Sequence, residues 1–285
     1  MVIFRDPSLA LFAVAAICYC IAAIYGLLGL LRPERFRGFT VELILFLGFI
    51  LQTIALFQRS FQTHSCPIGN PFETVQFMTW SMMFLNIIIG KTFRHSVLGV
   101  FTGTSAAILS VIALNVSSWD YISKDRLFGG NPWIEAHASL AMCSYGFFLM
   151  LAITSIMYLL QNYGLKHKRF LPFLDLLPSI YKLERINFRL LLCGNLVYTT
   201  SLLIGGVFWY NNPDHILFWK IFFAVSAWLG YTLLLFLRGL DKILARRMAW
   251  ACIFLCIWAL LTLWPVELNR DHKQDTPPTE SISQS

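Results

Sequence analysis

Long apolar stretches separated by short polar loops recur along the whole chain. A helix that crosses a bilayer needs about 20 mostly apolar residues, and none of the stretches has a proline in its middle, where it would interrupt a helix. The predicted spans are Ser8–Leu31, Thr40–Phe57, Phe72–Ile89, Ser96–Val116, Glu135–Leu160, Arg189–Trp209, Ile216–Leu237 and Met248–Trp264. The pattern therefore predicts an all-α fold, an integral membrane helical bundle of about eight transmembrane helices.

The composition supports the same class. The chain has 285 residues, of which 57% are hydrophobic and 13% are charged, whereas a soluble globular domain carries about 25% charged residues. These figures exclude soluble, disordered and small disulfide-rich proteins. Residues 1–268 are predicted to form a single multi-pass membrane domain, and residues 269–285 a polar, disordered tail.

The positive charge gives the orientation of the spans. Most of the 22 lysines and arginines fall in four alternate loops. These basic loop residues are Arg32, Arg35, Arg37, Lys91, Arg94, Lys166, Lys168, Arg169, Lys182, Arg185, Arg189, Arg238, Lys242, Arg246 and Arg247. The positive-inside rule places such loops in the cytoplasm and both termini outside, as expected of a multi-pass protein of a bacterial inner membrane. A net charge of +7 spread over short loops forms no single basic stripe, so nucleic acid is not a predicted partner.

The spans lack the groups that pumps and secondary transporters use. No histidine lies in the middle of a span, and the carboxylates Glu42, Glu73, Glu135 and Asp241 fall near span ends. Proton relays and coupled transporters keep ionisable groups at mid-depth. We find no phosphate-binding loop, nucleophile elbow or zinc-protease motif, so no catalytic residue is predicted. A small-solute exporter is the weakest alternative, because only the number of spans supports it.

Aromatic and histidine side chains gather on the predicted outer face. The tryptophans Trp119, Trp133, Trp209 and Trp219 fit either the aromatic belt of a membrane interface or an apolar shelf for a flat ring system. His137, near the start of the fifth span, is either a surface residue or an axial ligand of haem iron, which a neutral imidazole can provide. A second outer histidine would then complete the ligation.

Three segments carry a family pattern. The first is Ser65–Ser81, which contains Asn-Pro-Phe-Glu and a Trp-Ser pair. The second is His137–Tyr145, in which histidine, leucine and tyrosine recur at helical spacing. The third combines Leu183–Arg189 with Gly205–Trp209, where a helix ends in Gly-x-x-Trp. Together they resemble the cytochrome c assembly protein family, membrane haem-handling proteins of the CcsA and HemX type, over about residues 40–272.

The first of these segments also has a purely structural interpretation. Asn70, Pro71 and Glu73 occupy the N-cap, first and third positions of a helix start. An asparagine and a glutamate at this spacing form a capping box. The resemblance and the capping box predict the same helix start.

The resemblance implies a function on the outer face. In this family an outer histidine at the position of His137 binds haem, and a second one follows the last helix, where His272 stands; His215 is a weaker candidate for that role. The tryptophans named above would lie beneath the haem. The resemblance further implies a membrane partner subunit of a cytochrome c assembly system, and apocytochrome c as the recipient of haem.

The chain also departs from the family. The tryptophan-rich loop of Trp-x-Trp-Asp type is missing between the sixth and seventh spans, where only Tyr210–His215 is found. The positions of two intramembrane histidines are matched by Gln52 and Arg238, neither of which is an imidazole. These departures favour an alternative: a HemX-like regulatory or scaffold membrane protein that does not transfer haem.

Overall fold

The protein is described by a computed structural model. It describes residues 7–32, 34, 36–90, 97–120, 131–167, 176–211 and 218–274, without the side chains of residues 167, 211, 218–220 and 262–274. All regular elements in this part of the chain are helical. They are α1 (Pro7–Leu31), α2 (Gly38–Thr63), α3 (Pro71–Gly90), α4 (Leu98–Asn115), the 3-10 turn η2 (Ser117–Trp119), α5 (Pro132–His167), α6 (Ile180–Asn211), α7 (Phe218–Gly239) and α8 (Ala245–Gln274).

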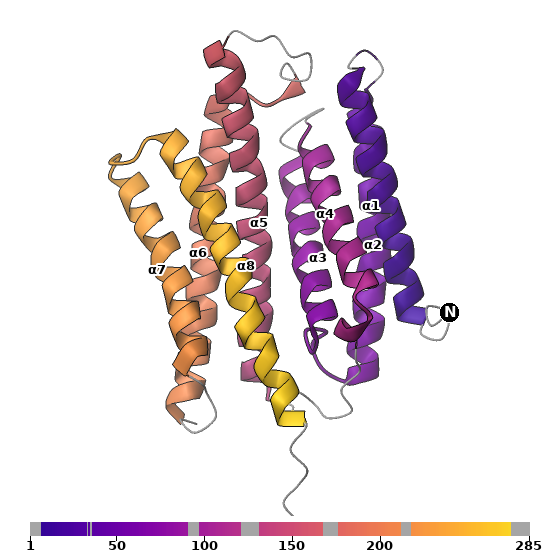
Figure 1. Ribbon diagram of the computed structural model, residues 1–285, viewed down its shortest axis with the longest axis vertical. Helices are drawn as coiled ribbons and strands as arrows, with labels where there is room; N and C mark the ends of the chain where they lie inside the picture. Colours follow the sequence, from indigo (N-terminus) through magenta and orange to yellow (C-terminus); the bar gives the residue numbers. More distant parts are fainter. Residues whose placement is uncertain are drawn as a thin grey trace, which may run out of the picture.

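The helices form two four-helix units that lie side by side (Figure 1). In the first unit, α1 and α3 each pack against α2 and α4; in the second, α5 and α7 each pack against α6 and α8. The units meet mainly where α3 packs on α5. There the Ser81 hydroxyl donates to the Cys143 carbonyl at 3.0 Å, and Gly146 provides the space, because a Cβ at this position would overlap Ser81.

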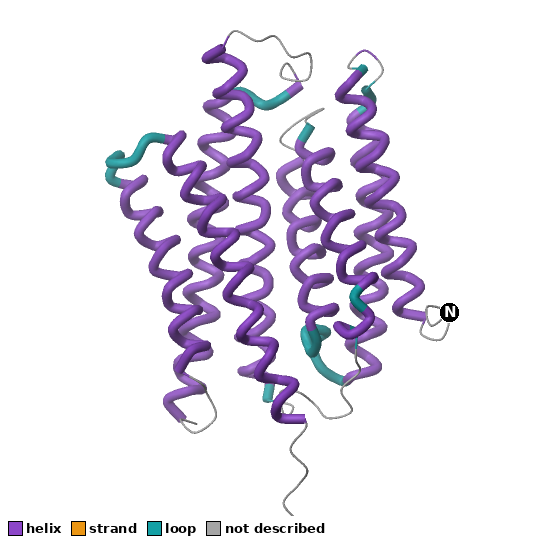
Figure 2. The backbone as a smooth tube through the Cα atoms, viewed as in Figure 1, coloured by secondary structure: helices purple, strands orange, loops and turns teal. Residues whose placement is uncertain are grey.

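The two ends of the bundle differ in charge. The helices run roughly parallel to one another (Figure 2), and α1 to α7 are long and apolar enough to cross a membrane in the part of the chain that is described. The last turns of α1, α3, α5 and α7 and the first turns of the helices that follow them share one end, here called the basic end. The opposite end, which holds the start of α1, is called the outer end, following the positive-inside rule.

The predicted spans coincide with the eight helices, and the differences lie at helix ends. α2 continues past Phe57 to Thr63, so Arg59 lies inside a helix and not in an outer loop. The backbone of α8 runs to Gln274, so residues 269–274 of the predicted disordered tail are helical. The rest of that tail lies outside the described residues.

The start of α6 is a second large difference. The helix begins at Ile180, although the predicted span starts at Arg189. Leu183, Ile186 and Leu190 recur on one face and pack into the core, while charged side chains lie beside them in the sequence at Lys182, Glu184, Arg185 and Arg189. A hydropathy count ends at such charges, whereas an amphipathic helix tolerates them on its solvent face.

Candidate functional site

His137 is held by α6 through one ring nitrogen. Its Nδ1 lies 2.7 Å from the Ser201 carbonyl oxygen. A carbonyl oxygen can only accept, so Nδ1 carries the proton, and in the neutral imidazole the lone pair stays on Nε2. The Ser201 hydroxyl in turn donates to the His137 carbonyl at 2.7 Å. These reciprocal bonds fix the tautomer and the orientation of the ring.

A glycine on α6 makes room for the imidazole. A Cβ at Gly205 would lie 2.7 Å from both Nδ1 and Cε1 of His137, well inside van der Waals contact. The adjacent Gly206 differs, since a Cβ there would have no neighbour within 4 Å. The Gly-Gly pair therefore contains one residue that the His137 ring requires and one that it does not.

Exchanging these two glycines for alanine separates their roles. Gly205→Ala is expected to lower the free energy of unfolding by about 1–3 kcal/mol, because the added methyl group overpacks the His137 contact. Gly206→Ala is expected to leave it unchanged or raise it by up to about 1 kcal/mol, through the better helix propensity of alanine. Denaturant unfolding of the purified variants in detergent measures both. Equal effects at the two positions would contradict the tight contact between α5 and α6.

Two of the predicted tryptophans lie close to His137. Trp133 lies on the α5 face that carries His137, and Trp209 lies on the α6 face that carries Gly205. Trp133 is one turn before His137 on α5, and Trp209 is one turn beyond Gly205 on α6. Residues four apart share a helix face, so both tryptophans lie next to His137 or Gly205, closer to the outer end. These four residues are called the His137 seam. Trp133 is 66% exposed and Trp209 is 43% exposed. Their exposure leaves aromatic surface available beside the histidine.

The other predicted ligands are placed differently. Trp119 packs on the hydrophobic cluster of the first unit that includes Phe12 and Phe72, and this packing accounts for the residue without a ligand. The side chains of Trp219 and His272, and the whole of His215, lie outside the described residues. His272 itself is in the last turns of the α8 backbone.

The His137 seam is suited to a single coordinate bond. In the part of the chain that is described, both hydrogen bonds of the ring are made at Nδ1, and no three His, Cys, Asp or Glu side chains come together as a metal cage. Metal-binding histidines commonly donate their second ring N–H to a carbonyl oxygen. Among the described residues, the donor at His137 is therefore a single one, as for one axial ligand of haem.

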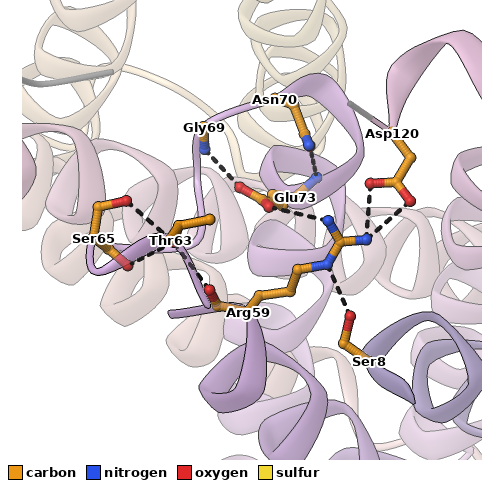
Figure 3. A network of polar contacts seen from close by, with 8 residues as sticks. All are labelled: Ser8, Arg59, Thr63, Ser65, Gly69, Asn70, Glu73 and Asp120. Atoms are coloured by element: carbon orange, nitrogen blue, oxygen red, sulfur yellow. Dashed lines mark hydrogen bonds and ion pairs between the residues drawn. The ribbon is translucent and has the colours of Figure 1, made fainter. Parts of the chain in front are cut away.

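A buried polar cluster at the outer end of the first unit was not anticipated from the sequence (Figure 3). Arg59 is fully buried, and its Nη2 donates to both carboxylate oxygens of Asp120 at 2.8 and 2.9 Å. Its Nη1 lies 3.7 Å from Glu73 Oε1, and its Nε donates to Ser8 at 2.9 Å. One guanidinium thus joins α1, α2, α3 and the segment after α4.

The capping box that the sequence predicts is confirmed, with one change of partner. The Glu73 backbone N–H donates to Asn70 Oδ1 at 2.7 Å. The Glu73 carboxylate accepts from the Gly69 backbone N–H at 2.8 Å, one residue before the usual position. The same carboxylate also faces Arg59, so the helix start of α3 is part of the buried cluster.

The loop between α2 and α3 reaches the helix that carries His137. Cys66 Sγ lies 3.1 Å from the Ser139 hydroxyl on α5. Burial raises the pKa of the Cys66 thiol, and the Ser139 hydrogen bond opposes this only partly. The thiol therefore stays protonated near neutral pH and serves as a packing contact between the two units.

Gln52 and Arg238, the positions that the resemblance matches to intramembrane histidines, are both engaged in hydrogen bonds. Gln52 is fully buried; its side chain accepts from the Tyr19 hydroxyl and donates to Gln76 Oε1, each at 2.7 Å. Arg238 forms an ion pair with Glu184 and donates to the Ile243 carbonyl at 3.0 Å. Both residues have structural partners among the described residues.

Comparison with known proteins gives a consistent set of matches. Residues 68–269 match the family described as cytochrome C assembly protein. Protein HemX of Bacillus subtilis is 24% identical over 233 residues, covering 80% of this chain and 83% of HemX. The cytochrome c biogenesis protein CcsA of Prochlorococcus marinus is 24% identical over 238 residues, covering 73% of this chain and 72% of CcsA. Protein NrfI of Wolinella succinogenes is 26% identical over 220 residues, covering 76% of this chain and 22% of NrfI.

Proposed function

This chain belongs to the cytochrome c assembly protein family, and we propose that it holds haem at the outer end of the bundle for the assembly of c-type cytochromes. It is a multi-pass membrane protein of cytochrome c biogenesis. In the proposed role, His137 is one axial ligand of the haem iron. Trp133 and Trp209 flank the same helix faces and offer aromatic surface to the flat ring.

One observation carries the proposal. The His137 ring is oriented by two α6 groups, the Ser201 carbonyl and Gly205, and this arrangement leaves Nε2 as its ligand atom. A histidine in an ordinary surface position needs neither a fixed tautomer nor a glycine whose missing side chain leaves space for the ring. Haem, when bound, supplies the vinyl groups that become attached to cysteine thiols of an apocytochrome. The protein contributes orientation of the ligand and an apolar surface.

The proposed partners follow from this role. A protein that presents haem needs a recipient, for which we propose apocytochrome c. It also needs a membrane partner subunit of a cytochrome c assembly system, as the resemblance to the family implies. His272 is the proposed second ligand. It lies near the outer end of α8, and the resemblance places a second outer histidine near the end of the last helix.

A deletion strain tests the function directly. Loss of the gene is expected to reduce or abolish haem-stained c-type cytochromes in membrane extracts. Restoring the wild-type gene should recover them, and the His137→Ala gene should not. A normal cytochrome profile in the deletion strain would contradict the proposed role in assembly.

A regulatory or scaffold role without haem transfer is the second candidate. It is favoured by Gln52 and Arg238, which engage other partners where the family has intramembrane histidines. Unchanged c-type cytochromes in the deletion strain would favour this second role.

A further inference from the structure

A pocket at the basic end lies between the start of α6 and the end of α7. It has a volume of about 310 Å³ and is lined by Tyr181, Glu184, Arg185, Phe188, Arg238, Gly239 and Asp241. The four α6 residues recur at the spacing of one helix face. The α7 side of the pocket is open at Gly239, where a Cβ would meet nothing within 4 Å. The pocket is far from His137, which lies at the other end of α5 and α6.

The charges that line this pocket are not all paired with each other. Arg238 is neutralised by Glu184 and donates to the Ile243 carbonyl. Arg185 stacks over the Tyr181 ring, 4.6 Å from its centroid, and donates to its hydroxyl. Because tyrosine is neutral, the charge of Arg185 has no counter-ion among the described residues. The Asp241 carboxylate likewise forms no ion pair within the part of the chain that is described.

The pocket therefore offers one positive and one negative group to a ligand. A guanidinium binds a phosphate through charge-assisted, bidentate hydrogen bonds. A carboxylate accepts hydrogen bonds from a primary ammonium group in the same way. A phosphoethanolamine group carries both charges on one short chain.

The surroundings indicate that this group belongs to a lipid. Exposed apolar side chains continue from the pocket along both helices into the membrane-spanning part. They are Leu192 and Leu196 on α6, and Leu229, Leu233, Phe236 and Leu240 on and just after α7. A soluble ligand would not contact these apolar side chains, whereas the acyl chains of a lipid pack along them. Pockets between helices at the cytoplasmic surface that carry arginine side chains can bind the phosphate of a lipid headgroup.

We propose that this pocket binds a phosphatidylethanolamine of the inner leaflet, with the phosphate at Arg185 and the ammonium group at Asp241. Phosphatidylcholine lacks the N–H donors that Asp241 would accept. Phosphatidylglycerol lacks the positive charge. The site is thus selective for a primary amine, and it is independent of the proposed haem function.

Native mass spectrometry of the full chain in detergent tests the proposal. The protein is titrated with phosphatidylethanolamine, phosphatidylcholine and phosphatidylglycerol that have identical acyl chains, and phosphatidylethanolamine is expected to bind best. Arg185→Gln should weaken its binding about tenfold, the effect of losing one charged hydrogen bond. Arg185→Lys should keep most of it. Asp241→Asn should remove the preference over phosphatidylglycerol, and asparagine tolerates the left-handed backbone of that position, φ 54°.

Matched controls keep the outcome unambiguous. Arg189→Gln removes an exposed arginine of α6 outside the pocket and should not change binding. Soluble phosphoethanolamine should compete poorly, because it lacks the acyl chains. Equal binding of the three lipids, or phosphatidylethanolamine binding that survives both Arg185→Gln and Asp241→Asn, would overturn the proposal. Tight competition by soluble phosphoethanolamine would overturn the assignment to a lipid.

Discussion

Replacing His137 with alanine is expected to lower the haem affinity of the purified protein by at least about tenfold. Mutating only the hydrogen-bonding partner of a metal ligand costs 10- to 100-fold in metal affinity, so loss of the ligand itself sets a lower limit. The Soret absorption and the haem content of protein loaded with haem measure the effect. Because alanine leaves the space of an imidazole beside Ser201 and Gly205, free imidazole added to the buffer should restore part of the spectrum.

A second histidine at the outer end provides the matched control. His64 is exposed at the C-cap of α2, where its backbone is left-handed with φ 50°. Asparagine tolerates this conformation, so His64→Asn removes an outer imidazole without strain. It should leave haem binding unchanged. If His137→Ala and His64→Asn bind haem equally well and give the same Soret band as the wild type, His137 is not a ligand.

The helices could be predicted from the sequence because the bilayer imposes a simple rule on each of them separately. A span needs apolar length, and this is a local property. The capping box at Asn70 and Glu73 was predictable for the same reason, because its residues are three apart. Helix ends that contain charged residues were harder to predict. α2 continues beyond its apolar stretch through Arg59, and α6 begins before its apolar stretch, ahead of Arg189.

The site was predictable only in part, because its geometry depends on contacts between distant segments. His137 stood out as a histidine at a helix start, but its link to Ser201 crosses 64 residues of sequence. The tryptophans were predicted as one group. The structure separates them: Trp133 and Trp209 lie on the faces that carry His137 and Gly205, and Trp119 packs on the other unit. Only the packing of α5 on α6 distinguishes these tryptophans.

Replacing Arg59 with methionine is expected to destabilise the protein by about 3–5 kcal/mol, the usual cost of removing one partner of a buried ion pair. Methionine fills similar space and introduces no charge. Glu73, with 3% of its side chain exposed, and Asp120, with 21% exposed, would then face each other without the guanidinium. The free energy of unfolding in detergent, measured by denaturant titration, gives the loss.

Two comparisons separate the buried charges from the change of residue type. Arg238→Met breaks an ion pair whose side chains are 19% and 28% exposed, and partly solvated pairs contribute about 1 kcal/mol or less. Adding Glu73→Gln to Arg59→Met should recover part of the stability, because it removes a buried carboxylate that has lost its counter-charge. If Arg59→Met costs no more than Arg238→Met, or the double variant is less stable than the single one, then Arg59 fills space and does not balance charge. The guanidinium that joins four segments would then contribute only its volume to the outer end.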